Sequence, residues 1–308
     1  MPGVMSGSPV YEMLAQGVEE AAAAHNAVQP NAVTVTVIEG GFNQAEWESK
    51  MTSMTASGSY DLIVSSNPSL PDIVSRVSAH FPAQRFLLLD GELAGNPQVY
   101  TLRYNQREQA YMAGYIAALE TEELAARAGE GRRQIGLVAA QEYPVMNNII
   151  LPGYLEGAQA VHPGYTVDFR IVGNWYDAAR AADLAADMIE GGVWVLLCIS
   201  GKANEGVVNA AAQKGAKVVW FDTNGYQIQP GTVIGSSVLY QNTAAREQTL
   251  RYLDNKLPFW TAETLGVNDG YVDFIEDDPL YLQAVSPGVR EKQAAMIARI
   301  RSGELTLD

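Results

Sequence analysis

Asp222 stands where a carboxylate could bind a ligand. It follows the apolar run VVWF at 218–221 and opens the polar stretch DTNGY. Such a run is typical of a strand buried on both faces of a parallel sheet, so the carboxylate should lie where this strand leaves the core. An ionised carboxylate accepts strong hydrogen bonds, which suits the hydroxyls of a sugar or polyol. The structural alternative is a cap or turn former, and it applies equally to Asp90 after the run RFLLL.

Similar groups follow most of the other predicted strands. Ligands of open α/β sheets bind beyond the carboxyl ends of the strands, where loops lead into helices. Rings in these loops can stack on a planar ligand. The candidate ligand-binding residues are Ser8, Tyr11, Ser66, Asn67, Tyr143, Trp175, Lys202, Asn204, Asp222, Asn224 and Tyr240. Each residue taken alone could instead be a cap, a core residue or a solvated side chain. Their shared position at strand ends is the reason to group them as a candidate site.

The sequence offers little for catalysis or metal binding. His25, His80 and His162 each end a predicted helix with a proline shortly after, which favours a structural role. Cys198 is the one cysteine and lies in an apolar run, as a small buried residue would. No dinucleotide fingerprint, phosphate loop or nucleophile elbow occurs in the sequence. We therefore expect neither an enzyme nor a metal or cofactor site.

The charge of the chain argues against nucleic acid as a partner, and its hydropathy argues against a membrane-spanning helix. The net charge of −15 and the scattered basic residues argue against nucleic acid, whose binding needs basic patches. No stretch approaches the roughly 20 apolar residues that a membrane helix needs.

The strands and helices expected from periodicity alternate along the chain, which predicts an α/β fold with parallel sheets. The predicted strands are 33–39, 60–65, 85–90, 99–104, 134–140, 165–172, 193–200, 217–222 and 232–238. The order strand, polar loop, helix and strand ending in aspartate occurs at 60–90 and again at 193–222. Two similar lobes account for this repetition better than one long sheet.

The amino-terminal residues are unusual for a doubly wound sheet, which normally has a central first strand. Here MPGV meets a helical pattern from Tyr11 onward with hardly any strand before it. We expect that the sequence begins late, without a first strand and without a visible signal peptide or lipidation cysteine.

Three stretches of the sequence are distinctive: YDLIVSSNPSLPDIVSRVSAHFPAQRFLLLDG, AYMAGYIAAL and GYLEGAQAVHPGYTVDFRIVGNWYDAARAADLA. In this order they resemble the basic membrane protein family of ABC-transporter substrate-binding lipoproteins, which includes the purine nucleoside receptor. The resemblance implies a type I periplasmic-binding-protein fold, with two doubly wound parallel-sheet lobes joined by a three-crossover hinge. The expected lobes are 1–104 with 239–267 and 105–238 with 268–308, and the ligand cleft is expected between them.

The resemblance also implies a function. Asp222 matches the aspartate that holds ribose in nucleoside receptors, whereas the first-loop Phe-Asn pair aligns with Val10-Tyr11 and the lysine position is Tyr240. These departures favour a wider flat ring with a flexible polyol, and SGSPVYEML resembles the first loop of the riboflavin-binding branch. We expect a periplasmic or cell-surface lipoprotein that acts as a monomer. Its expected transported ligand is riboflavin, which it would pass to an ABC permease and ATPase. The alternatives are a purine nucleoside receptor and a ligand-sensing regulatory protein of the same fold.

Overall fold

The computed structural model describes residues 3–5, 8–41, 43–129 and 132–307 and divides into two compact units. Unit 1 is Met1–Tyr104 with Tyr240–Leu265, and unit 2 is Asn105–Leu239 with Gly266–Asp308. The chain therefore passes from one unit to the other three times, after residues 104, 239 and 265.

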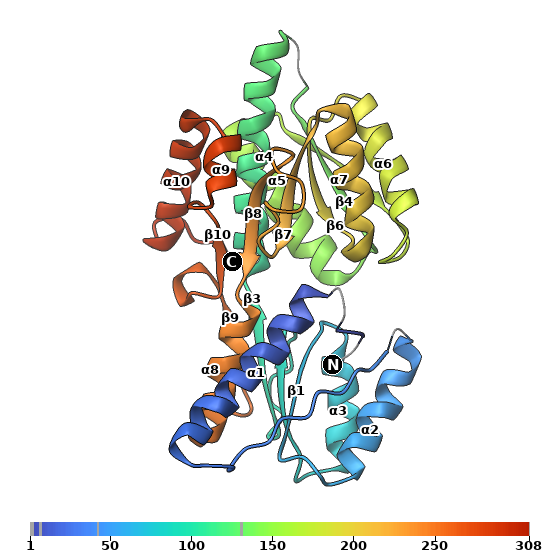
Figure 1. Ribbon diagram of the computed structural model, residues 1–308, viewed down its shortest axis with the longest axis vertical. Coiled ribbons are helices and arrows are strands. Elements are labelled where there is room, and N and C mark those ends of the chain that lie inside the picture. The colour runs from blue at the N-terminus through green and yellow to red at the C-terminus, as the bar shows by residue number, and fades with distance from the viewer. Residues whose placement is uncertain (1–2, 6–7, 42, 130–131, 308) are drawn as a thin grey trace. The chain divides into compact units, whose positions relative to one another are not determined.

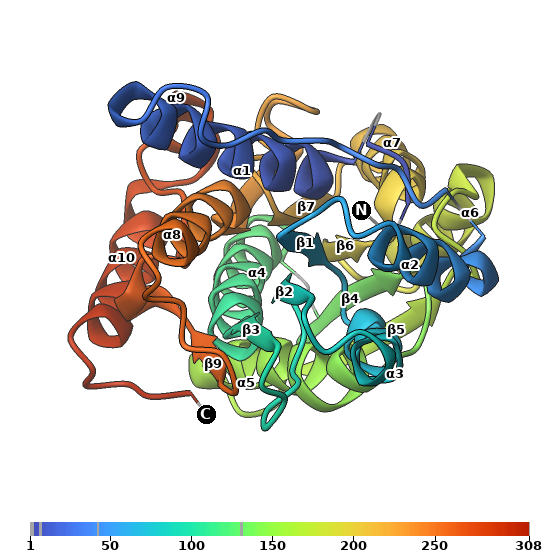
Figure 2. The same ribbon diagram turned by 90° about the horizontal axis from the view of Figure 1, so that it is seen from below.

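Unit 1 is built on a four-stranded parallel sheet in the order β1-β2-β3-β9. The strands are β1 (Leu62–Ser66), β2 (Arg85–Leu89), β3 (Val99–Tyr104) and β9 (Ala262–Leu265). The helices are α1 (Pro9–Val28), η1 (Gln44–Glu46), α2 (Trp47–Ala56), α3 (Leu70–His80) and α8 (Gln241–Leu253). Helices α1 and α8 pack together over one face of the sheet, and α2 and α3 pack together over the other (Figure 2).

Unit 2 is built on a six-stranded sheet in the order β10-β8-β7-β6-β4-β5, parallel except for the antiparallel β10. The strands are β4 (Gln134–Ala139), β5 (Thr166–Ile171), β6 (Val195–Ile199), β7 (Lys217–Asp222), β8 (Val233–Leu239) and β10 (Val272–Phe274). The helices are α4 (Gln106–Ala128), η2 (Met146–Ile150), α5 (Leu151–Val161), α6 (Ala178–Glu190), η3 (Gly201–Ala203), α7 (Asn204–Lys214), η4 (Val267–Asp269), α9 (Pro279–Ala284) and α10 (Pro287–Arg301). Helices α4 and α5 cover one face of the sheet, and α6 and α7 cover the other (Figure 1).

Glycine allows the helices of unit 2 to approach one another closely. A Cβ at Gly114 of α4 would lie 1.9 Å from the carbonyl oxygen of Tyr154 in α5, which is closer than any real contact. Gly157 of α5 meets the carbonyl of Tyr111 in the same way, at 2.0 Å. The glycine in the stretch YMAGYIAAL therefore serves helix packing.

The α/β class with parallel sheets is confirmed, and eight of the nine predicted strands are present. The strand predicted at 33–39 is wrong, since this segment belongs to neither sheet. Its Val-Thr alternation suits a strand, but a strand needs a neighbour for its backbone hydrogen bonds. A cavity separates the segment from β1. Strands β9 and β10 were not expected, because four and three residues give little periodicity.

The remaining structural expectations concern single residues. Cys198 is fully buried, and burial raises the pKa of its thiol. His25 lies in the last turn of α1, His80 ends α3, and His162 follows α5, as predicted. Among the helices of the described residues, none combines the length and the apolar character required to cross a membrane.

Candidate ligand-binding site

Asp222 is the last residue of β7 and has a left-handed backbone conformation, with φ of 72°. Its carboxylate accepts a hydrogen bond from Nε2 of Gln109, with Oδ1 at 3.1 Å. Burial raises the pKa of Asp222 to about 6, and the hydrogen bond from Gln109 lowers it in part. Near neutral pH this carboxyl group is therefore mostly ionised but poorly solvated, which suits it to accept hydrogen bonds from a ligand.

Gln109 was not anticipated from the sequence. It lies in the first turn of α4, 113 residues before Asp222, and its side chain is fully buried. Nε2 also donates to the carbonyl oxygen of Ser237 at 3.1 Å, so the amide bridges β7 and β8. Its Oε1 is buried and has no hydrogen-bond partner among the described residues. Only the fold brings a helix residue to this strand end, and no local pattern could have indicated it.

The amide of Asn224 braces the loop after β7. Its Nδ2 donates to Oδ2 of Asp278 at 2.9 Å, and its Oδ1 accepts from the backbone N–H of Tyr226 at 3.1 Å. Asn224 is exposed, but these two bonds occupy groups that the sequence suggested for a ligand. We therefore assign Asn224 first to the shape of the loop that carries Asp222.

The loops after β5 and β6 lie against each other. The ring of Trp175 abuts Gly201, where a Cβ would lie 3.3 Å from Cε3 and where φ is +62°. The N–H of Ala203 donates to the carbonyl oxygen of Trp175 at 3.3 Å. Trp175 is half-buried and Lys202 is exposed. A ring held in this way keeps part of its surface accessible for stacking.

Asn204 lies at the start of α7 and is buried. Its Oδ1 accepts hydrogen bonds from both the backbone N–H and the hydroxyl of Ser200, each at 2.7 Å. These bonds fix the turn between β6 and α7.

The carboxyl edge of the sheet in unit 2 gathers most of the candidates. Parallel strands end at the same edge, so the loops after β4, β5, β6 and β7 must share it. Tyr143 follows β4 and is half-buried, Trp175 follows β5, Lys202 follows β6, and Asp222 ends β7. This edge therefore combines two aromatic rings, one cation and one half-buried carboxylate.

The carboxyl edge of unit 1 carries a second set. Asn67 follows β1, and its Nδ2 donates to the hydroxyl oxygen of Tyr11 on α1 at 3.2 Å. Ser66 ends β1 and is buried, and Ser8 is the N-cap residue of α1. The bond between Asn67 and Tyr11 joins the first turn of α1 to the loop after β1. Tyr240 is the N-cap residue of α8 and is half-buried.

Across the described residues, no group of three or more His, Cys, Asp or Glu side chains could hold a metal ion. The groups that the geometry offers are acceptors, donors and rings for a small organic molecule.

Comparison with known proteins identifies the family of the chain. The family model described as "ABC transporter substrate-binding protein PnrA-like" matches residues 1–306. The chain is 24% identical over 265 residues to the ABC transporter nucleoside-binding protein BmpA of Lactococcus lactis subsp. cremoris, a match that covers 80% of this chain and 71% of that protein. Matches to other relatives, including basic membrane protein D of Borreliella burgdorferi, span about half of those proteins' lengths.

Solved structures share the fold. An ABC transporter solute-binding protein from Aeropyrum pernix K1 has a TM-score of 0.83 at 21% sequence identity, covering 100% of this chain and 91% of that chain. The similarity extends to other type I periplasmic binding proteins, which confirms the predicted fold. With a family model matching nearly every residue, the chain belongs to the PnrA-like family of ABC transporter substrate-binding proteins and is not an enzyme.

Proposed function

We propose that this protein captures a planar aromatic molecule that carries several hydroxyls, with riboflavin as the favoured ligand, and delivers it to an ABC permease and its ATPase. The observation that carries the proposal is the carboxyl edge of unit 2. There the half-buried rings of Tyr143 and Trp175 share one edge with the carboxylate of Asp222. Rings provide stacking surface, and a poorly solvated carboxylate strongly favours hydroxyl donors.

The environment of Asp222 supports this assignment. Because burial raises its pKa to about 6, the free protein carries an ionised group that is under-solvated at neutral pH. Donation from ligand hydroxyls would relieve that deficit, and affinity should therefore fall as the pH drops below 6 and the carboxyl becomes protonated. Gln109 holds one carboxylate oxygen in place and so orients the group.

A purine nucleoside is the second candidate, favoured by the relative named as nucleoside-binding. It also combines a flat ring with hydroxyls. Val10-Tyr11 stands where the resemblance to nucleoside receptors expects phenylalanine-asparagine, and Tyr240 stands where it expects lysine. These differences lead us to place riboflavin first.

Direct binding separates the two candidates. We expect purified protein to quench riboflavin fluorescence, and calorimetry with riboflavin, inosine and adenosine to rank the flavin first. Binding of a nucleoside but not of riboflavin would replace the favoured ligand. Failure of all three, together with no small molecule released from denatured protein, would contradict the proposed function.

Delivery requires a membrane partner, and we expect the protein to act outside the cytoplasmic membrane as a lipid-anchored monomer. Vesicles containing the permease and ATPase should import the ligand only when this protein is supplied on the binding side. Equal import without it would favour a sensory role for the same fold.

A further inference from the structure

The last two helices of the chain pack on unit 2, α10 against α4 and α9 against β8 (Figure 1). We call this packing the C-terminal seam. Oγ of Ser286, the N-cap residue of α10, donates a hydrogen bond to Oε2 of Glu123 on α4. Nε2 of Gln293 on α10 donates to the carbonyl oxygen of Met112 on α4 at 3.1 Å. Side-chain hydrogen bonds therefore join α10 to α4 near both ends of their contact.

Glu120 of α4 is buried at this seam, with 5% of its surface exposed. It lies one helical turn before Glu123, and its Oε1 has no hydrogen-bond partner among the described residues. The hydroxyl of Tyr281 on α9 is also buried without a partner in the described part of the chain. Burial raises the pKa of this phenol, and the neighbouring carboxylates of Glu276 and Glu120 raise it further. A buried carboxylate without a partner is costly, and the cost falls if the group is protonated or if water reaches it.

The charges around Glu120 do not compensate it. Burial raises its pKa to about 7, repulsion from Glu123 reinforces the shift, and Lys217 and Arg127 oppose it. Both cations have other partners, because Arg127 pairs with Glu123 and Lys217 donates to the carbonyl oxygen of Gly231 at 2.6 Å. Strands β4, β6 and β8, which pack on α4, contain no charged residue. Charged groups on the other elements that pack on α4 have partners of their own, including Asp222 of β7, Asp273 of β10, Glu156 of α5 and Arg290 of α10.

Helix α9 also contacts the loop that carries Asp222. Asp278, the N-cap residue of α9, accepts a hydrogen bond from Nδ2 of Asn224 at 2.9 Å. One turn further along α9, the ring centroid of Tyr281 lies 5.7 Å from that of Tyr226. Asn224 and Tyr226 are themselves joined, since the N–H of Tyr226 donates to Oδ1 of Asn224 at 3.1 Å. Helix α9 therefore braces the loop after β7, and the same tyrosine that packs on the loop faces Glu120.

We propose that the protonation state of Glu120 controls how firmly the C-terminal seam is closed and, through α9, how firmly the loop of Asp222 is braced. The closed seam favours the neutral carboxyl, whereas opening admits the water that solvates the carboxylate. Because the folded-state pKa is raised, the stabilisation of the closed seam is complete below about pH 4.5 and is lost as the pH rises through about 7. The consequence for the ligand rests on the proposed function, since a less firmly braced loop presents Asp222 less well.

Amide hydrogen exchange of the complete, ligand-free protein at pH 6 and pH 8 tests this control. After correction for the intrinsic exchange rate, protection of residues 279–301 should be about tenfold lower at pH 8. A carboxyl group whose pKa falls from about 7 in the closed seam to about 4.5 in the open one gives this factor. The N–H groups of Gly225, Tyr226 and Ile228, which are hydrogen-bonded within the loop, should lose protection in parallel. Glu120→Gln should remove both responses, because its side chain stays neutral.

Two further variants complete the test. Glu291→Gln makes the same charge change at an exposed site on α10 and should leave both responses intact. Glu123→Gln keeps an acceptor for Ser286 but removes the repulsion, so it should make both responses smaller. The same pH response in Glu120→Gln as in the unsubstituted protein would overturn the role of Glu120. A response in α9 and α10 with unchanged protection of the loop would overturn the link to Asp222.

A ligand measurement follows from the same coupling. Riboflavin added at pH 8 should restore protection of both α9 and the loop, because a ligand that binds the braced loop stabilises the closed seam. Binding of riboflavin without this recovery would contradict the coupling. Failure of riboflavin to bind would count against the proposed function alone, and the pH responses of the ligand-free protein would still decide the role of Glu120.

Discussion

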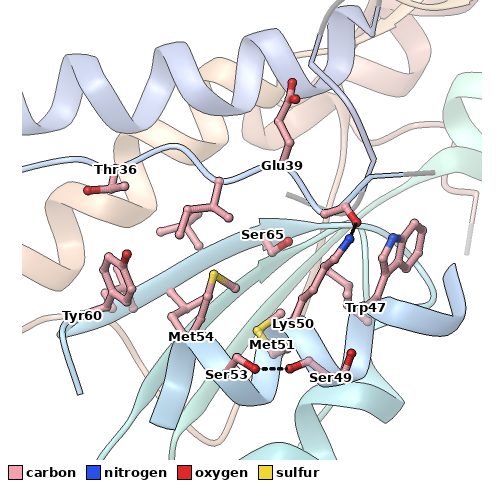
Figure 3. Close-up of a pocket in the computed structure, with 16 residues that line it drawn as sticks. Thr36, Glu39, Trp47, Ser49, Lys50, Met51, Ser53, Met54, Tyr60 and Ser65 are labelled. Carbon is pink, nitrogen blue, oxygen red and sulfur yellow. Dashed lines mark hydrogen bonds between the residues drawn. The ribbon is translucent and has the colours of Figure 1, made fainter. Parts of the chain in front are cut away.

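Unit 1 and unit 2 both contain the order strand, helix and strand, as β1-α3-β2 and β6-α7-β7. They differ in what lies beside the first strand of each series. In unit 2, β4 is buried and pairs with β5 on one side and β6 on the other. In unit 1, a cavity lies between β1 and the segment that contains Thr36 and Ile38 (Figure 3), and residues 33–39 belong to neither sheet. A segment with strand-like Val-Thr alternation can therefore remain irregular. A strand depends on its neighbours, because its backbone groups are satisfied only by a partner.

The two units also differ in their charged groups. In unit 2, burial raises the pKa of Glu120, Asp222 and Glu276. In unit 1, the shifted carboxyls are Glu46 and Glu48, whose pKa values are lowered by hydrogen bonds from Lys50 and Arg76 at the surface. Unit 2 therefore carries the under-solvated carboxylates, which is where we place ligand recognition.

The largest expected effect tests the role of β4. Leu137 of β4 is fully buried, so Leu137→Asp should lower the free energy of unfolding by at least about 4 kcal/mol, because it buries an unpaired charge. The matched change Val37→Asp, at a residue that is 39% exposed in the unpaired segment, should cost less than about 0.5 kcal/mol. Urea unfolding followed by circular dichroism compares them, and similar losses would remove the distinction between the units.

A smaller effect is expected at Glu120 in α4. Burial, reinforced by repulsion from Glu123, raises its pKa to about 7, and its Oε1 has no partner among the described residues. Because the folded-state pKa is raised, the stability associated with the protonated group is complete below about pH 4.5 and is lost as the pH rises through 7. Glu120→Gln should therefore stabilise the protein by about 2 kcal/mol at pH 8 and have little effect at pH 4.

Unfolding by urea at the two pH values measures this difference. Glu291→Gln on α10 is the exposed control, for which the two pH values should give the same small effect. A Glu120 variant with equal effects at pH 4 and pH 8 would show that burial does not displace its titration.

The next effect concerns ligand affinity. Asp222→Asn keeps a residue that tolerates positive φ but removes the charge, so it should weaken ligand binding by about 1.5 kcal/mol, roughly tenfold. The unsubstituted protein should lose affinity between pH 7 and pH 5, as the carboxyl becomes protonated through its pKa of about 6, and the variant should not. Calorimetry at both pH values measures this. Unchanged affinity would leave Asp222 as a turn former.

The smallest effect is expected at the matching aspartate of unit 1. Asp90 has the same position after its strand and the same left-handed backbone, with φ of 55°. Asp90→Asn retains that conformation, and we expect ligand affinity to change less than about twofold, within about 0.4 kcal/mol. A tenfold loss at Asp90 would make both strand-end aspartates ligand-binding groups and would weaken the contrast between the units.

Local patterns were sufficient for much of the fold. Apolar or alternating runs bounded by turn residues located eight strands, because the hydrophobic pattern of a strand reflects how many of its faces are buried. The repeated order of elements around Asp90 and Asp222 indicated two similar lobes. The candidates after β4, β5, β6 and β7 follow from the same rule, since parallel strands end at one edge.

Local sequence patterns could not predict the hydrogen-bond partners of those candidate residues. Gln109 reaches Asp222, Asn67 reaches Tyr11, and Asn224 reaches Asp278, each across 50 or more residues. Burial raises the pKa of Asp222, and α4, which is distant in the chain, packs against β7 and supplies Gln109.

The sequence by itself determined the alternation of strands and helices, the repetition of that order and the edge where polar groups emerge, because these depend on hydrophobic period and chain direction. Only the tertiary structure decided which amide holds Asp222, that Gly114 serves a close helix crossing, and that residues 33–39 lie beside a cavity instead of in a sheet. Those outcomes depend on contacts between residues distant in the chain, and a local pattern contains no information about which distant partner will be present.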